Sequence, residues 1–297
     1  MEKPAGPQVE LRDVRVQLPG HAELQVASLA VDAGQRVALF GGAGAGKSLL
    51  LRVLAGRVQP STGSRLVAPN LRSQGGMQFV PRAPAGPGFL TCQQVLALAY
   101  RSMSGVQRAS RAAEALAAAD LYPVRHRRLS SLSDGSRLAL RIAMAAGMHP
   151  AVLLMDDCTA SLPEPAANRI WQYLEELRQE YGLTLIYATT RSDEAEEADV
   201  VVMMDHGRVL RVASPGELLA AVPTQQVMVE ALDPKLVSRT IRGTFHVEVE
   251  EEKNAVTFRT ADGALAAADL FRHAGDTVRM VTVERPSLWD ALAELTR

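Results

Sequence analysis

The sequence predicts an α/β protein with a parallel sheet, followed by a smaller α+β domain. Apolar segments at residues 37–40, 151–155, 183–188 and 200–204 contain almost no polar residues and alternate with helical patterns. Strands of this kind are buried on both faces, which is typical of a parallel sheet covered by helices. After residue 222 the segments become shorter and their pattern changes, which indicates a second domain.

The composition agrees with a folded protein of about two domains. Of the 297 residues 47% are hydrophobic and 22% are charged, so the chain can build a core and is not disordered. The formal net charge of −1 argues against nucleic acid as a partner. The two cysteines, Cys92 and Cys158, are too few to stabilise domains of this size by disulfide bonds, which indicates a reducing compartment. We interpret Cys158 as a passive small residue.

The sequence predicts neither a signal peptide nor a membrane span. The first residues lack a basic start followed by an apolar stretch, and no run approaches the roughly 18 apolar residues that cross a bilayer. We therefore expect contact with a membrane only through a partner protein.

The other elements of the first domain follow from alternation and helical periodicity. Val9–Val16 and Leu24–Val31 flank a Pro-Gly turn and predict two strands. Helical periodicity predicts helices at residues 47–57, 91–103, 110–119, 136–148 and 164–181.

The end of the chain predicts a small ferredoxin-like domain at residues 223–297, after a first domain at residues 1–222. Its expected elements are strand 226–231, helix 234–241, strand 245–249, strand 255–259, helix 263–273, strand 277–283 and a helix from residue 287. This βαββαβ order is that of the split βαβ fold. A run of glutamates at 248–252 predicts a solvated edge, and we expect Trp289 to pack into the core.

A glycine-rich segment after the strand at 37–40 predicts a phosphate-binding loop. It fits the pattern G-x-x-x-x-G-K-[ST] at the start of a helix and comprises, with the next residue, Gly41, Gly42, Ala43, Gly44, Ala45, Gly46, Lys47, Ser48 and Leu49. Glycines let backbone N–H groups turn toward an anion, and the helix start adds positive partial charge. Lys47 supplies a charge for the β- and γ-phosphates, and the Ser48 hydroxyl is placed to bind Mg²⁺. Because the chain has only four lysines, this position favours a nucleoside triphosphate site over an incidental turn.

Two further motifs identify the kind of phosphate-binding protein. The apolar segment 151–155 ends in Asp156 and Asp157, of which Asp156 fits the Mg²⁺-associated acid of a Walker B strand. Residues 132–136 read Leu-Ser-Asp-Gly-Ser, and Ser133 precedes Asp156 by 23 positions. With these motifs, residues 8–222 resemble the ATP-binding cassette (ABC) ATPases, whose signature reads LSGGQ.

The resemblance implies a P-loop ABC nucleotide-binding domain with a mixed sheet, an antiparallel β subdomain and a helical signature subdomain. It implies that ATP and Mg²⁺ are bound between two cassettes, with Ser133 and Gly135 contacting the γ-phosphate of the partner cassette. It also implies an integral membrane permease as partner, a second cassette, identical or different, and a cytoplasmic, peripheral location on the inner face of the plasma membrane. In the family, the helix at 93–103 receives a helix of the membrane subunit.

Several positions depart from the family pattern where hydrolysis takes place. Asp157 stands where the family has a glutamate as general base, and Thr190 stands where it has the switch histidine. Arg82 replaces the Q-loop glutamine and, having no acceptor atom, cannot bind Mg²⁺. The D-loop and the signature also differ, at Pro163, Asp134 and Ser136. The phosphate loop is intact, so we hypothesise firm ATP binding with slow or no hydrolysis, in an asymmetric heterodimer.

The tail suggests the transport class but leaves alternatives open. Residues 285–292, Arg-Pro-Ser-Leu-Trp-Asp-Ala-Leu, resemble the PSLEDVF ending of ABC-2-type export ATPases, which favours the energising subunit of a membrane exporter. One alternative is a regulatory or assembly subunit that needs ATP binding but not hydrolysis. A divergent but active homodimer that uses Asp157 is another. A soluble ABC protein acting on a macromolecule would usually carry a coiled-coil insertion, which this sequence lacks.

Overall fold

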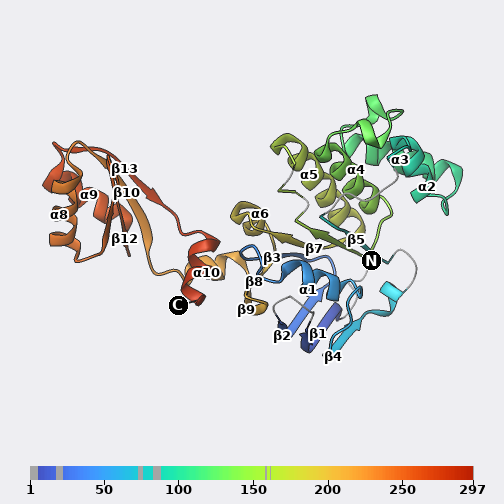
Figure 1. Ribbon diagram of the computed structural model, residues 1–297, viewed down its shortest axis with the longest axis horizontal. Coiled ribbons are helices and arrows are strands. Elements are labelled where there is room, and N and C mark those ends of the chain that lie inside the picture. Colours follow the sequence, from blue (N-terminus) through green and yellow to red (C-terminus); the bar gives the residue numbers. More distant parts are fainter. Residues whose placement is uncertain are drawn as a thin grey trace. The chain divides into compact units, whose positions relative to one another are not determined.

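The computed structural model describes residues 6–17, 23–72, 76–82, 88–157, 159–160 and 162–296. The chain divides into two compact units, Met1–Pro215 and Gly216–Arg297, each with its own sheet and helices (Figure 1). Cys158 lies outside the described residues, and so does the interpretation made for it. Across the described ranges, no helix is long and apolar enough to cross a membrane.

The first unit is built on a mixed sheet with the order β4-β1-β2-β9-β8-β3-β7-β6-β5. Its strands are β1 Pro7–Val16, β2 Leu24–Asp32, β3 Arg36–Phe40, β4 Thr62–Val67, β5 Met77–Val80, β6 Val152–Asp156, β7 Thr184–Thr189, β8 Val200–Asp205 and β9 Arg208–Ala213. β5, β6, β7, β3 and β8 run parallel, whereas β1 pairs antiparallel with β2 and β4. The predicted fold class, a mixed sheet with an antiparallel β subdomain, is confirmed.

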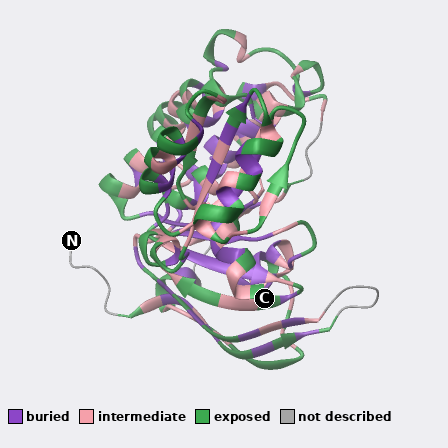
Figure 2. Cartoon of the chain, turned by 90° about the vertical axis from the view of Figure 1, so that its left-hand side faces the viewer, coloured by how far each residue is buried: buried purple, intermediate pink, exposed green. Residues whose placement is uncertain are grey.

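Burial explains why these segments form two kinds of strand. Every residue of β6 and β7 is buried, whereas β1 and β2 bury mainly alternate side chains. A strand buried throughout must be covered on both faces, and a strand with alternating burial needs cover on one face only. The buried residues follow the strands and the inner faces of the helices (Figure 2).

Helices cover the parallel part of this sheet and form a group of their own. They are α1 Lys47–Leu54, α2 Cys92–Ala99, α3 Gly105–Ala118, α4 Asp134–Ala146, α5 Glu164–Tyr181 and α6 Ser192–Glu196. α2, α3 and α4 pack together and against α5, as predicted for a helical subdomain (Figure 1). α1 ends three residues before its predicted end because Gly56 has a left-handed backbone, with φ 70°. α3 begins five residues before its predicted start because the Ser104 hydroxyl accepts the N–H of Gln107 as an N-cap.

The second unit contains a four-stranded antiparallel sheet with the order β11-β12-β10-β13. Its elements are α7 Pro215–Ala220, β10 Gln225–Ala231, α8 Pro234–Phe245, β11 Val249–Glu251, β12 Ala255–Thr260, α9 Gly263–Ala274, β13 Val278–Glu284 and α10 Leu288–Thr296. The sheet and helices share a core that includes Val227, Val229, Ile241, Phe258 and Leu270. The βαββαβ order is that of a ferredoxin-like unit.

Two predictions for the second unit are wrong in detail. The strand expected at 245–249 begins only at Val249, because α8 continues to Phe245 and His246 ends it in a left-handed conformation, with φ 52°. Trp289 does not pack into the core: its exposed fraction is 41%, whereas its neighbours Leu288 and Leu292 are buried. The glutamate-rich segment does lie at the sheet edge, as β11.

The turn between β8 and β9 supports the phosphate-binding loop through Gly207. Its N–H donates to the carbonyl of Ala45 at 3.1 Å, and its carbonyl accepts from the N–H of Gln25 at 2.7 Å. Gly207 has φ 79°, and a Cβ there would lie 2.1 Å from the carbonyl oxygen of Glu23. A side chain at this position must therefore displace β2 or the turn.

We expect Gly207→Ala to lower the stability of the first unit by about 2–3 kcal/mol and its melting temperature by about 5–10 °C. Differential scanning calorimetry measures both. Gly105→Ala is the matched control, because a Cβ at Gly105 meets no atom within 4 Å and alanine favours the helix. An equal loss of stability in both variants would contradict this account of the turn.

Candidate functional site: a nucleotide pocket at the end of the parallel strands

The predicted phosphate-binding loop connects β3 to α1 at the carboxyl edge of the parallel strands. Gly41 directly follows β3 and packs closely against β8. A Cβ at this position would lie 2.1 Å from the carbonyl oxygen of Met204 on β8. The loop then enters α1 at Lys47, with Gly46 as its N-cap residue. The first N–H groups of α1 have no acceptor within the helix, so they are available to an anion.

Lys47 is held inside this loop rather than in solvent. Its Nζ donates to the carbonyl oxygens of Gly41 at 2.6 Å and Gly42 at 2.7 Å, and the residue is buried. Burial lowers the pKa of the Lys47 ammonium, while Asp157 and Asp156 oppose this shift. The ammonium is thus fixed where the loop would wrap a phosphate chain.

Ser48 and Asp156 form the pair that could hold a Mg²⁺ ion. The Ser48 Oγ donates to Asp156 Oδ1 at 2.6 Å, and Asp156 is buried at the carboxyl end of β6. Mg²⁺ prefers oxygen ligands and commonly takes one or two from the protein and the rest from phosphates and water. A hydroxyl and a carboxylate that already touch fit this donor set, so both could bind the ion together with a nucleotide.

Asp157 lies beside this pair in an unusual environment. Its backbone is left-handed, with φ 51°, and its Oδ2 lies 3.4 Å from Arg82 Nη1. Its Oδ1 is buried and makes no hydrogen bond within the described structure. Burial raises the pKa of Asp157, although Arg82 and Lys47 pull in the opposite direction. The carboxylate is therefore only partly compensated by its single ion pair.

These residues surround one pocket of about 530 Å³. Its lining includes the predicted residues Ala43, Gly44, Ala45, Gly46, Lys47, Ser48, Leu49, Arg82, Asp156, Asp157 and Thr190. Gly41 and Gly42 contribute through their carbonyls, which hold Lys47. Sequence reasoning missed Leu24, Arg52, Ala188 and Gly207 as lining residues. Arg52 could have been found, because it lies one helical turn after Ser48 on the same face of α1.

Thr189, the neighbour of Thr190, is held by hydrogen bonds within the fold and does not line the pocket. The Thr189 hydroxyl donates to Glu194 Oε2 at 2.8 Å and accepts the N–H of Arg191 at 3.0 Å. Thr190 itself lines the pocket, at the end of β7. A threonine there can form a hydrogen bond but has no imidazole to take up a proton.

The signature residues lie apart from this pocket, at the start of α4. The Ser133 Oγ accepts the N–H of Ser136 at 3.1 Å as an N-cap, and Asp134 pairs with Arg137. Ser133 is exposed and Gly135 is half-buried, and neither lines the nucleotide pocket of its own chain. Their contact with a nucleotide held by a second cassette stays a prediction.

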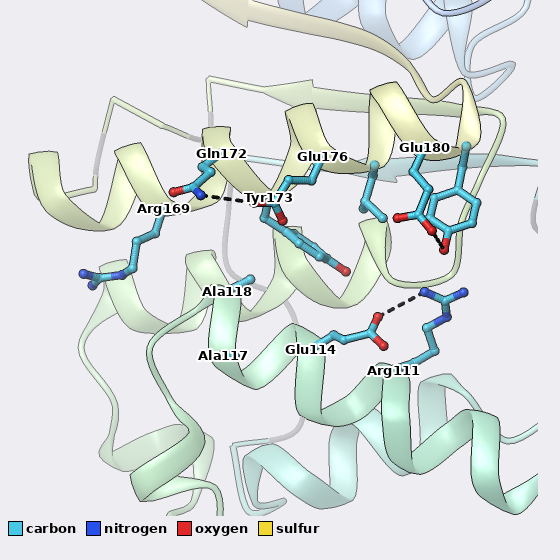
Figure 3. Close-up of a pocket in the computed structure, with 11 residues that line it drawn as sticks. Arg111, Glu114, Ala117, Ala118, Arg169, Gln172, Tyr173, Glu176 and Glu180 are labelled. Atoms are coloured by element: carbon cyan, nitrogen blue, oxygen red, sulfur yellow. Dashed lines mark hydrogen bonds and ion pairs between the residues drawn. The ribbon is translucent and has the colours of Figure 1, made fainter.

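A second hollow of similar size, about 550 Å³, lies between α3 and α5 (Figure 3). Its charged side chains pair with their neighbours: Arg111 lies 3.0 Å from Glu114, and Arg169 lies 3.0 Å from Asp120. None of the predicted site residues lines it. The residue chemistry, not the volume, therefore distinguishes the nucleotide pocket.

A glycine-rich loop with a buried lysine, next to a Ser–Asp pair at the end of parallel strands, defines a P-loop nucleotide-binding domain. Residues 24–160 match the family model described as ABC transporter. The chain carries the ATPase domain of the ABC transporter family. Domains of this family bind ATP, typically with Mg²⁺.

Curated relatives and a solved structure agree with this family. The methionine import ATP-binding protein MetN of Brucella abortus (strain 2308) is 29% identical over 80% of this chain and 69% of that protein. The sulfate/thiosulfate import ATP-binding protein CysA of Synechococcus elongatus is 30% identical over 74% of this chain and 66% of that protein. A dimeric structure of the ATP-binding cassette MJ0796 bound to ADP and Pi has a TM-score of 0.60 at 24% identity, over 69% of this chain and 98% of that one. The similarity to the MJ0796 structure supports the fold alone.

The relatives bear on the transport class predicted from the tail. MetN and CysA are named as import proteins. The resemblance of residues 285–292 to ABC-2-type exporters finds no support in these relatives. The prediction of an ATP-binding subunit is confirmed, whereas the prediction that it belongs to an exporter is not.

The raised pKa of Asp157 predicts a pH-dependent gain of stability when this charge is removed. A carboxyl with a raised pKa in the folded protein costs stability at every pH where it is ionised, and the cost disappears below its unfolded pKa, near 3.8. We therefore expect Asp157→Asn to melt at a higher temperature than the wild type at pH 7, and this difference to shrink as the pH falls through about 4. Calorimetry across pH measures it.

Asp120→Asn is the matched control, because Asp120 is also left-handed, with φ 58°, and also ion-paired, but its side chain is 66% exposed. We expect no such gain from it. A lower melting temperature for Asp157→Asn at pH 7 would contradict the assignment of an undercompensated charge.

Proposed function

We propose that this chain is the ATP-binding subunit of a membrane ABC transporter with a degenerate hydrolytic site. It binds Mg-ATP through Lys47, Ser48 and Asp156 and pairs with a second cassette, which is a different chain with a competent site. Hydrolysis at its own pocket is slow or absent. The cassette pair then closes on ATP and opens mainly through hydrolysis at the partner's site.

The observation that carries this proposal is the ion pair between Arg82 and Asp157. A general base must accept a proton from water, and its pKa and reach decide how well it does so. Asp157 has a side chain one methylene shorter than glutamate and faces a guanidinium at 3.4 Å. Thr190 offers no imidazole beside it. The groups that hold phosphates are thus complete, while the groups that would activate water are weak.

The proposed membrane partner is an integral permease, bound on the cytoplasmic side. Large apolar side chains are exposed on and next to α2 and α3: Phe89 is 72% exposed, Leu98 52% and Val106 83%. Large exposed apolar side chains are candidates for a surface that binds another protein. This chain would therefore reach the membrane only through its partner.

The direction of transport separates two versions of the proposal. The relatives named as the import ATP-binding proteins MetN and CysA are similar to this chain over 71–84% of its length. The exporter reading rests on the short tail at 285–292. The larger match favours an importer, and a transport assay in vesicles with the permease distinguishes the two.

A regulatory or assembly subunit is the second candidate, and the same ion pair favours it. In that case ATP binding alone would clamp the complex. Loss of function in Lys47→Ala, with full function retained in Asp157→Asn and in a cassette pair whose second site is also inactive, would select this candidate.

Co-expression with an integral permease tests the proposed role. We expect the chain to sediment with membranes only when its permease is present and to be released when the exposed Phe89 and Leu98 are both replaced by aspartate. Sedimentation that is independent of every co-expressed membrane protein would contradict the proposal.

A further inference from the structure

We infer that Arg82 is the residue by which this pocket distinguishes ATP from ADP. Arg82 pairs with Asp157 in the structure; the γ-phosphate of ATP takes the guanidinium over from Asp157, whereas ADP leaves the pair intact. This inference rests on the proposed function, since it concerns the same pocket. It adds a specificity-determining role for a residue that the family pattern does not place there.

The fold brings Arg82 to the right place. β5 and β6 are parallel neighbours with Val80 opposite Met155, so Arg82 and Asp157 each lie two residues beyond this pair, at the same edge of the sheet. The backbone next to Arg82 is anchored, because the carbonyl of Pro81 accepts from Arg141 on α4 at 2.9 Å. The Arg82 side chain is 71% exposed. Because the backbone is held and the side chain is largely exposed, the Arg82 guanidinium can change partners without a movement of the strand.

The contact with Asp157 is weak enough to be exchanged. Its single N–O distance is 3.4 Å, which is longer than the 2.7–2.9 Å of a strong charge-assisted hydrogen bond. Asp157 also points its other oxygen into a buried position without a partner. A terminal phosphate offers three oxygens and about two negative charges, and a guanidinium can bind two of these oxygens at once. The γ-phosphate is therefore the stronger partner.

The other cations of the pocket cannot make this distinction as sharply. Lys47 is held by the loop carbonyls of Gly41 and Gly42, where it would serve the β-phosphate that ATP and ADP share as well as the γ-phosphate. Arg52 lies more than one turn into α1, away from the loop. Arg82 lines the same pocket and lies 3.4 Å from Asp157, next to Asp156, where a γ-phosphate and its Mg²⁺ would lie.

Competition binding of Mg-ATP and Mg-ADP to the full chain, followed with a fluorescent nucleotide, tests this role. We expect Arg82→Gln to weaken ATP binding about tenfold and to leave ADP binding within about twofold, so the preference for ATP falls about tenfold. Asp157→Asn removes the competing carboxylate, so we expect stronger ATP binding. That gain should vanish in the double variant that also carries Arg82→Gln.

Arg52→Gln removes a charge of the same sign from the same pocket and is the matched control. We expect it to change the affinities for ATP and ADP by similar factors and to keep their ratio. An unchanged ratio in Arg82→Gln, or a gain from Asp157→Asn that persists without Arg82, would overturn the inference while leaving the proposed function in place. A wild-type chain that binds neither nucleotide would overturn both.

Discussion

Replacing Lys47 with alanine is expected to raise the dissociation constant for Mg-ATP at least about a hundredfold. Lys47 is the one lysine among the described residues that line the pocket, and charge-assisted hydrogen bonds to phosphate are worth about 1.5–3 kcal/mol each. The backbone N–H groups at the start of α1 remain in the variant, so some weak affinity for phosphate should persist. Isothermal titration calorimetry with Mg-ATP measures the loss.

Lys235→Ala is the control for this experiment. Lys235 is an exposed lysine on α8, in the second unit, and its replacement removes the same charge from the chain. We expect it to bind Mg-ATP as the wild type does. Since Lys47 also holds the carbonyls of Gly41 and Gly42, circular dichroism must show that its variant is folded. A folded Lys47→Ala protein with affinity within a few fold of the wild type would contradict the phosphate-binding role.

Restoring the family's residues at three of the altered positions, those in the nucleotide pocket, is expected to increase ATP turnover at least about a hundredfold. The variant combines Asp157→Glu, Arg82→Gln and Thr190→His. It extends the carboxylate by one methylene, removes the guanidinium that pairs with it, and adds an imidazole at the end of β7. A positioned general base contributes roughly 10²–10⁴-fold to such reactions.

Phosphate release at saturating Mg-ATP measures this gain, in the same assembly for every variant. Adding Lys47→Ala to the triple variant should abolish it, which shows that the gain arises in this pocket. If the wild type already turns over as fast as the triple variant, the site is not degenerate, and the divergent but active homodimer becomes the better account.

The phosphate loop could be predicted from the sequence because its function and its fold depend on neighbouring residues. Glycines at fixed positions, a lysine and a hydroxyl lie within one strand–turn–helix segment, and the structure shows this segment between β3 and α1. The Ser48–Asp156 contact also follows from the sequence, since Asp156 ends one parallel strand and the loop that leads to Ser48 follows another, at the same edge of the sheet.

The contact between Arg82 and Asp157 could not be predicted in the same way. Each departure from the family pattern was visible, but their pairing depends on β5 and β6 being neighbours in the sheet with Val80 opposite Met155. Strand order is decided by long-range packing, which a single sequence does not display. Likewise, Trp289 has helical spacing to buried leucines on both sides, and only the packing of α10 decides that the ring stays exposed.

The fate of one bound ATP tests the central claim most directly. Purified chain is loaded with radiolabelled Mg-ATP at a protein concentration above its dissociation constant, and samples are quenched in acid over time. The account predicts that the wild-type chain retains about one labelled ATP per molecule and that this nucleotide stays ATP for many minutes. The triple variant should convert its bound ATP to ADP quickly. Conversion of the wild-type label to ADP within seconds, or no label retained at all, would contradict it.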